Sequence, residues 1–294
     1  MPVPIPASAC CARSDDPSAI RAAFDEHGFV VFRGFLPPAE ASAALAAIAE
    51  FTGAELPATV AAGTLPAADV FYDDAGVPGT MKQIQHLDGH SAYFHDVMHE
   101  QLAPICEAAL GEPVRGENMQ YFNKPGTGSY AGSATVDGSR PTPPHQDGYY
   151  FMIEPQQAVT MWLALEDADD ANGCLRYVRG SKQRGMRPHS FSGVMGFSQT
   201  ISDYDESASG DGAEEMLMAA KAGDLIIHHS LMIHRAPPNG CAERSRRAVG
   251  AIFYGKSAQP WGCASGVGLV DNLCSRPLRP LAATLYVNPI CSSF

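Results

Sequence analysis

The chain has 294 residues, of which 20 are Lys or Arg and 32 are Asp or Glu, so its formal net charge is −12. This acidic balance argues against nucleic acids and anionic membranes as partners, because both attract basic protein surfaces. Hydrophobic residues make up 45% and charged residues 18% of the chain, which excludes a disordered acidic protein and is ordinary for a globular one.

The N-terminal segment, MPVPIPASACCARSDD, lacks the basic start and the apolar stretch of a secretion signal. The rest of the chain has no run of about 18 apolar residues, so we expect no membrane-spanning helix. The eight cysteines include no C-x-x-C pair, which argues against a zinc ribbon and favours free thiols. Together these features predict a cytoplasmic protein.

The first hundred residues carry helical patterns around one short strand. Asp16-Pro17-Ser18 is typical of a helix start, and Gly28 ends that helix before the apolar run 29–32, which predicts a strand. Further helices are predicted over 38–52 and 91–110. The Gly-, Pro- and Ala-rich stretch 53–80 between them predicts a loop.

Beyond residue 112 short apolar runs alternate with turn signals. These runs predict strands at 118–122, 149–153, 158–165, 174–178, 224–228 and 247–254. The Asn172-Gly173 pair between two of them favours a hairpin turn, and the polar stretch 186–220 predicts an excursion on the surface. Regularly spaced short strands are typical of a sandwich or barrel.

No convincing linker divides the chain, so we expect a single domain over residues 1–294. Its helical N-terminal part would cover about 15–110 and its β core about 112–256. The C-terminal extension, 257–294, shows little periodicity and receives no structural prediction.

His145 and Asp147 stand two residues apart in the segment PPHQDG. On an extended segment, residues two apart point to the same side, so an imidazole nitrogen and a carboxylate oxygen can reach one metal ion. Such a pair supplies two ligands of the 2-His-1-carboxylate triad of non-haem Fe(II) oxygenases. An H-x-D pair is common by chance, so the interpretation requires a third ligand.

The segment GDLIIHHSLMIH, residues 223–234, offers three histidines. His234 is the expected third ligand, because a Gly-Asp turn leads a strand whose end would deliver it to the pocket. His228 and His229 are expected to lie in the core or the pocket wall, with His229 as the alternative ligand.

An open iron site needs a group that holds an anionic co-substrate, and a guanidinium binds a carboxylate through two hydrogen bonds. Arg244, Arg246 and Arg247 follow His234, and the last two begin the predicted strand RAVGAIFY. Two of these three arginines are expected to lie in a solvated turn.

Several stretches together resemble the phytanoyl-CoA dioxygenase family of Fe(II)- and 2-oxoglutarate-dependent oxygenases. They are HGFVVFRGFL, MKQIQ, MQYFNKPGTG, PPHQDGYYF, MWLALEDADDANGCLRYVRGSK, AGDLIIHHSLMIHRAPPN and SRRAVGAIFYG, and they cover roughly residues 20 to 256. The resemblance implies a mainly β fold with flanking α-helices, built on a double-stranded β-helix, or jelly-roll, core.

The resemblance also implies roles for particular residues. Iron would bind to His145, Asp147 and His234, and Arg246 would pair with the distal carboxylate of 2-oxoglutarate. Further contacts of the co-substrate would come from Gln120, Trp162 and either Lys82 or Gln83.

Two departures from the family pattern bear on the co-substrate site. Ala236 stands where the family often has a serine, two residues after the distal histidine. Arg246 lies one residue later than the family spacing, so Arg247 competes for its role. Asp147 argues against the halogenase variant, in which a small residue replaces the carboxylate.

The implied activity uses Fe(II), 2-oxoglutarate and O2 to oxidise an aliphatic C–H bond of a small organic molecule, with release of succinate and CO2. Hydroxylation, desaturation, ring formation and demethylation all remain open. The substrate pocket is predicted to include Tyr149, Tyr150 and Phe151, and the alternative for Tyr149 and Phe151 is a place in the core. Arg187 would meet an anionic substrate group, or else lie in a solvated loop. No dense basic patch suggests a coenzyme A tail.

Two other classes of protein fit the same residues. One is a non-catalytic jelly-roll module that binds a ligand. The other is a zinc hydrolase with the same three ligands, although the sequence has no H-E-x-x-H motif to supply a general base. The oligomeric state, monomer or homodimer, stays open.

Overall fold

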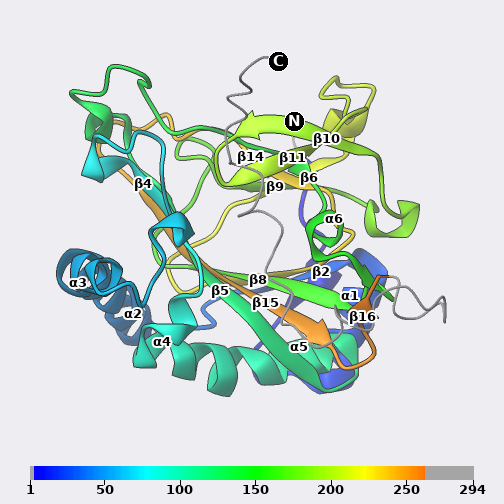
Figure 1. Cartoon of the computed structure of the whole chain (residues 1–294). Coiled ribbons are helices and arrows are strands. Elements are labelled where there is room, and N and C mark those ends of the chain that lie inside the picture. Colours follow the sequence, from blue (N-terminus) through cyan, green and yellow to red (C-terminus); the bar gives the residue numbers. More distant parts are fainter. Residues whose placement is uncertain (1–2, 262–294) are drawn as a thin grey trace, which may run out of the picture.

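The computed structural model describes residues 3–261 and shows two β-sheets that face each other (Figure 1). Helices cover the outer face of the larger sheet, on the side away from the smaller sheet (Figure 1). Residues 262–294, most of the predicted C-terminal extension, lie outside the described residues. Within residues 3–261, no helix is long and apolar enough to cross a membrane.

The larger sheet has eight strands in the order β1-β2-β13-β8-β15-β5-β4-β3. Every neighbouring pair is antiparallel except β1 and β2. In sheet order the strands are Cys10–Cys11, Phe29–Phe32, Leu225–His229, Ala158–Ala164, Arg246–Gly255, Val114–Lys124, Met81–Ile84 and Val70–Tyr72.

The smaller sheet has the order β12-β9-β14-β6, with strands Glu215–Met218, Leu175–Val178, His234–Ala236 and Thr142–His145. The chain repeatedly crosses between the sheets, for example from β5 to β6, from β8 to β9 and from β13 to β14. A separate hairpin, β10 (His189–Val194) and β11 (Phe197–Ile201), follows β9, and β7 (Ile153–Glu154) pairs with β16 (Gln259–Pro260).

Capping residues mark both ends of the first helix. The Asp16 carboxylate accepts the Ser18 backbone N–H at the start of α1 (Pro17–His27), and Gly28 ends it with a left-handed φ of 77°. The other helices on this side are α2 (Pro38–Glu50), α3 (Leu56–Ala61), α4 (Ala92–Asp96), the π-helical η6 (Val97–Leu102) and α5 (Ala103–Leu110).

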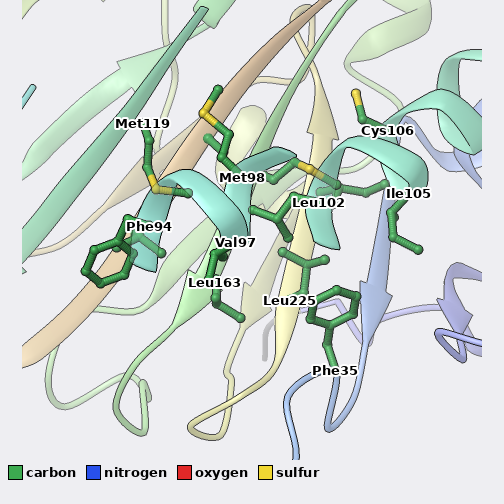
Figure 2. Close-up of a cluster of buried hydrophobic side chains, with 14 of the residues drawn as sticks. Phe35, Phe94, Val97, Met98, Leu102, Ile105, Cys106, Met119, Leu163 and Leu225 are labelled. Atoms are coloured by element: carbon green, nitrogen blue, oxygen red, sulfur yellow. The ribbon is translucent and has the colours of Figure 1, made fainter. Parts of the chain in front are cut away.

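Apolar side chains of α4, η6 and α5 meet the outer face of the larger sheet in one buried cluster. Figure 2 shows Phe94, Val97, Met98, Leu102 and Ile105 from the helices close to Met119, Leu163 and Leu225 from the strands. Each fully buried side chain of this kind contributes about 1.5–3 kcal/mol to stability, so this layer anchors the sheet that carries half of the site.

The pleat of the larger sheet separates two sets of residues. Along β8, Val159, Met161 and Leu163 face the helices, whereas Thr160 and Trp162 face the smaller sheet. Strand β15 divides in the same way: Val249, Ala251 and Phe253 join the helix-side core, and Arg246, Ile252 and Tyr254 point inward. The inward set lines the space between the sheets.

The predicted strand at 149–153 is wrong, because the run forms a short helix, α6 (Asp147–Phe151), that ends at Met152 with φ 50°. A five-residue apolar run carries no periodicity that separates a strand from one turn of helix. The Asn172-Gly173 turn joins no hairpin either: it leads from β8 in one sheet to β9 in the other.

Two segments hold more structure than their composition predicted. The stretch 53–80 is not a loop throughout, since it contains α3 and edge strand β3. The stretch 186–220 contains the β10–β11 hairpin and strand β12, which pairs with β9. Both segments are rich in small and polar residues, which have a low local preference for strands. Their strands form because of tertiary contacts with other strands, and composition does not reveal such contacts.

Candidate active site

Three potential metal ligands converge where β6 meets β14. His145 ends β6 directly opposite His234, which begins β14, and the centroids of the two imidazole rings lie 4.2 Å apart. Asp147 follows at the start of α6, with its Oδ1 atom 3.4 Å from His145 Nε2 and 3.6 Å from His234 Nε2. The three ligand atoms all lie within 4.8 Å of one another, and no other such group occurs in residues 3–261.

Backbone carbonyls fix which nitrogen of each histidine is free. His145 Nδ1 lies 2.7 Å from the carbonyl oxygen of Pro143, and His234 Nδ1 lies 3.0 Å from that of Met232. A carbonyl only accepts hydrogen bonds, so both Nδ1 atoms carry the proton and both Nε2 lone pairs are available. Burial lowers the pKa of His234 well below its usual value, which keeps this ring neutral.

The second carboxylate oxygen of Asp147 accepts hydrogen bonds from side chains of the larger sheet. Asp147 Oδ2 accepts the hydroxyl of Thr160 and lies 3.0 Å from His228 Nε2. His228 Nδ1 in turn lies 2.7 Å from the hydroxyl of Tyr177. Since a carboxylate only accepts, His228 donates from Nε2 and accepts from Tyr177 at Nδ1. Oδ1 is the oxygen left free to face the two imidazoles.

His229 does not reach this centre, although it was the alternative ligand. The pleat of β13 turns it to the helix side, where its ring lies 5.9 Å from that of Phe24. Its Nδ1 accepts the backbone N–H of Leu231 at 3.1 Å. Burial lowers the pKa of His229 to about 3, so it is a neutral core histidine.

A cavity of about 420 Å³ separates the two sheets and is lined by the three converging residues and Arg246. Arg246 is only 4% exposed, and its one hydrogen bond runs from Nη1 to the Gly173 carbonyl at 3.3 Å. No carboxylate among residues 3–261 pairs with it, and its Nε donor has no acceptor there. Burial lowers the pKa of Arg246 to about 10, which leaves it cationic at neutral pH. Burying an unpaired charge is energetically unfavourable, so the Arg246 guanidinium is suited to bind an anionic ligand in the cavity.

The neighbouring arginines are already paired outside the cavity. Arg247 alternates to the other face of β15, where its Nη2 donates to Glu166 Oε1 at 2.7 Å. Arg244 is partly exposed and binds the Asp169 carboxylate at 2.9 Å. Of the three candidates, Arg246 alone lines the cavity.

The structure brings the other expected co-substrate contacts to the same region. Gln83, Gln120 and Trp162 line the cavity, and the Arg246 guanidinium lies 5.5 Å from the centroid of the Trp162 ring. Lys82 lies beside Arg246 in a small adjoining recess, where its Nζ is 3.0 Å from Asp73 Oδ1.

Sequence reasoning missed another buried cation in that recess, in addition to Arg246 and Lys82. Lys124 pairs in register with Arg246 across β5 and β15, and its Nζ donates to the Arg140 carbonyl at 2.7 Å. Burial and the charge of Arg246 lower the pKa of Lys124 well below its usual value. Its place two residues after Phe122, on the inward side of β5, was the signal that could have revealed it.

The structure places only some of the residues predicted for the substrate pocket in the cavity lining. Tyr150 and Phe151 line the cavity, whereas Tyr149 does not. Because 149–151 is helical, Tyr149 points elsewhere: it is 39% exposed and stacks on His189. Arg187 does not line the cavity either, and its guanidinium pairs with Asp203 at 3.0 Å and Asp211 at 2.8 Å.

Comparison with known proteins places this site in a family. The family described as Phytanoyl-CoA dioxygenase (PhyH) matches residues 24–248. A phytanoyl-CoA dioxygenase of Arabidopsis thaliana is 28% identical over 227 residues, which are 73% of this chain and 71% of that protein. A 1-deoxypentalenic acid 11-beta-hydroxylase of Streptomyces exfoliatus is 26% identical over 237 residues, 78% of this chain and 77% of that protein.

Solved structures share the architecture. The epimerase SnoN in complex with Fe3+, alpha ketoglutarate and nogalamycin RO has a TM-score of 0.63 at 21% identity, over 90% of this chain and 95% of that chain. EctD from S. alaskensis with 2-oxoglutarate and 5-hydroxyectoine has a TM-score of 0.63 at 18% identity, over 89% of this chain and 86% of that chain. These similarities confirm the predicted jelly-roll fold.

Proposed function

The chain belongs to the phytanoyl-CoA dioxygenase family and is a non-haem Fe(II)- and 2-oxoglutarate-dependent oxygenase, and from its geometry we propose which residues perform that chemistry. His145, Asp147 and His234 bind the iron, and Arg246 binds the distal carboxylate of 2-oxoglutarate. One observation carries this assignment: Arg246 is a buried cation with no carboxylate partner among residues 3–261, in the same cavity as the three ligands.

With iron and 2-oxoglutarate bound, such a centre uses O2 to convert 2-oxoglutarate to succinate and CO2 and to oxidise a C–H bond of the substrate. The protein contributes a fixed set of donors: two Nε2 lone pairs and Asp147 Oδ1. Ligands on one face of an octahedron leave the other face open. The aromatic side chains of Trp162, Phe122 and Phe197 form part of the cavity wall beside these donors.

We propose a small organic molecule as the substrate and hydroxylation as the outcome. The names of the relatives, a phytanoyl-CoA dioxygenase and a 1-deoxypentalenic acid 11-beta-hydroxylase, support small-molecule oxidation in general. A coenzyme A ester is disfavoured, because within the described residues Arg246 is the only Lys or Arg that lines the large cavity. The single domain over 1–294 and the cytoplasm remain parts of this proposal, the latter supported by five free thiols in residues 3–261.

Anaerobic titration of the Fe(II)-loaded protein with 2-oxoglutarate tests the proposal. We expect a weak visible metal-to-ligand charge-transfer band, because the keto acid chelates iron at the open positions. Iron that binds without producing the band would contradict the co-substrate site and favour the zinc hydrolase. Failure to bind either component would favour a binding module without catalysis.

A further inference from the structure

A wall of amide side chains from two neighbouring strands lines the cavity. Gln83 and Gln85 come from β4 and the residue after it, and Asn118 and Gln120 come from β5. Along these strands Gln85 and Asn118 lie farther from Lys124, which pairs in register with Arg246, than Gln83 and Gln120, the expected co-substrate contacts. We infer that this amide wall recognises the hydroxyl groups of an uncharged substrate, a ring compound of the sugar or polyol type. The inference rests on the proposed function, since it concerns the substrate of the same site.

The amides form a directed hydrogen-bond chain with free ends. Gln83 Nε2 donates to Gln120 Oε1 at 3.1 Å, and Gln120 Nε2 donates to Gln85 Oε1 at 2.8 Å. Asn118 Nδ2 donates to the same Gln85 oxygen at 2.6 Å. Gln83 Oε1 is buried and has no donor in residues 3–261, so it closes the inner end of the chain. Gln85 Nε2 makes no hydrogen bond to any described residue, and its half-buried side chain lines the cavity, so it can donate to the oxygen of a substrate hydroxyl.

A glycine packs against the inner end of this chain. Gly196, in the turn between β10 and β11, has a φ of 78°, and a Cβ built on it would lie 2.7 Å from Gln83 Oε1. A side chain at 196 would therefore collide with this oxygen and shift the Gln83 amide. Because Gln83 orients Gln120, and Gln120 orients Gln85, the close approach of Gly196 helps to set the direction of the whole chain.

His86 supports the same assignment through its backbone. It has a φ of 56°, a left-handed conformation that is costly for a residue with a side chain. Asn118 Oδ1 accepts the His86 backbone N–H at 2.9 Å, so the amide wall itself holds this conformation. The strained backbone places the imidazole in the cavity lining, where it makes no hydrogen bond to any described residue. Such strain is typical of positions that contact a ligand.

The charges beside the amide wall disfavour an anionic substrate. Asp69 and Glu117 line the cavity there, and among residues 3–261 Arg246 is the only Lys or Arg in the cavity lining. Arg115 neutralises Glu117 at 2.6 Å, but Asp69 has no ion-pair partner among residues 3–261. A carboxylate or phosphate on the substrate would thus meet repulsion there.

The remaining lining completes a surface suited to ring compounds. Phe71, Phe151, Tyr254 and Trp261 border the same cavity, and Trp261 is 74% exposed at its edge. Planar amides bind hydroxyl groups while aromatic faces pack against the C–H bonds of a ring. A neutral hydroxylated ring satisfies both kinds of wall, and a purely aliphatic chain leaves the amides unpaired.

A matched pair of probes tests the inference: octyl β-D-glucopyranoside and octyl β-D-glucuronide, each below its critical micelle concentration. The second differs from the first by a carboxylate in place of a hydroxymethyl group. Each is added anaerobically to the Fe(II)- and 2-oxoglutarate-loaded protein at pH 7.5, and binding is followed by the change in the charge-transfer band and by calorimetry. We expect the neutral glucoside to bind at least tenfold more tightly.

Substitutions test whether the glucoside binds at the amide wall. His86→Gly removes the imidazole while tolerating the left-handed backbone, and Gln85→Leu removes the free donor. We expect each to weaken glucoside binding at least fivefold, whereas Gln183→Leu on the exposed surface leaves it unchanged. Equal affinity for both probes, binding of neither, or undiminished binding in both cavity variants would overturn the inference. Absence of the band before any glycoside is added would instead show that the proposed function fails.

Discussion

The two carboxylate oxygens of Asp147 contact residues of two different sheets. Oδ1 faces His145 and His234 on the smaller sheet, and Oδ2 is held by Thr160 and His228 of the larger sheet. The sequence pattern singled out the three residues that converge here, although Asp147 begins a helix instead of continuing the strand that the H-x-D spacing had suggested. His228 was expected in the core or pocket wall, and its contact with Asp147 depends on how the two sheets stack, which no spacing reveals.

Replacing His228 with Phe should weaken metal binding. The substitution removes the donor to Asp147 Oδ2 and leaves the Tyr177 hydroxyl unpaired, so the ligand carboxylate loses its fixed orientation. Loss of such an outer partner typically costs about 10–100-fold in metal affinity. Co(II) titration followed by its visible d–d absorption measures this without turnover. His228→Gln retains an N–H donor and should recover most of the affinity; equal loss in both variants would contradict the positioning role.

Arg246→Ala should raise the 2-oxoglutarate concentration needed for half-maximal turnover by about 100-fold, because a buried charge pair is worth several kcal/mol when one partner is removed. Arg247→Ala is the matched control, since Arg247 faces the other side of β15 and pairs with Glu166. It should lower stability and leave the 2-oxoglutarate requirement unchanged. The reverse pattern would transfer the role to Arg247.

At the scale of secondary-structure elements, one buried carboxylate links strands of the smaller sheet. Glu215 on β12 accepts the Tyr204 hydroxyl at 2.6 Å and pairs with Arg176 on β9 and Arg235 on β14. It therefore ties three neighbouring strands together beside the ligand His234. Strand β12 was not predicted, because it lies within the polar stretch 186–220. The contacts that define it come from residues distant in the chain.

Glu215→Gln should reduce the free energy of unfolding by about 2–4 kcal/mol at pH 7, since two partly buried guanidiniums lose their counter-charge. Burial raises the pKa of Glu215, but Arg235 and Tyr204 outweigh burial and set it below its ordinary value of 4.5. The stabilisation is thus complete above pH 4.5 and is lost as the pH falls below that value through the folded-state pKa. Urea unfolding at pH 7 and at pH 3.5 measures it. A difference between variant and parent that does not shrink in acid would contradict this account.

At the scale of the whole molecule, the site joins the two sheets. The proposed metal ligands belong to β6, β14 and α6, whereas Arg246 and the residues that hold Asp147 Oδ2 belong to the larger sheet. The resemblance to a known family predicted the jelly roll correctly. Strand patterns alone left sandwich and barrel open, because they do not specify which strands share a sheet.

Ligands that bridge the sheets should stabilise the fold. With Co(II) and 2-oxoglutarate each at about 100 times its dissociation constant, each should contribute about 2.7 kcal/mol, or roughly 5 °C in Tm. Thermal unfolding followed by circular dichroism checks this. In Arg246→Ala, the increment from Co(II) should persist and the increment from 2-oxoglutarate should disappear; an unchanged 2-oxoglutarate increment would refute the bridge.

The alternation along β15 has a consequence for how this enzyme can diverge. Val249, Ala251 and Phe253 maintain the helix-side core, while Ile252 and Tyr254 border the cavity. Selection for abundance and selection for a new substrate therefore act on different codons of one strand. Drift at the cavity positions can alter substrate choice while the core positions preserve the fold, so a lineage can change its chemistry within a ten-residue strand without first becoming unstable.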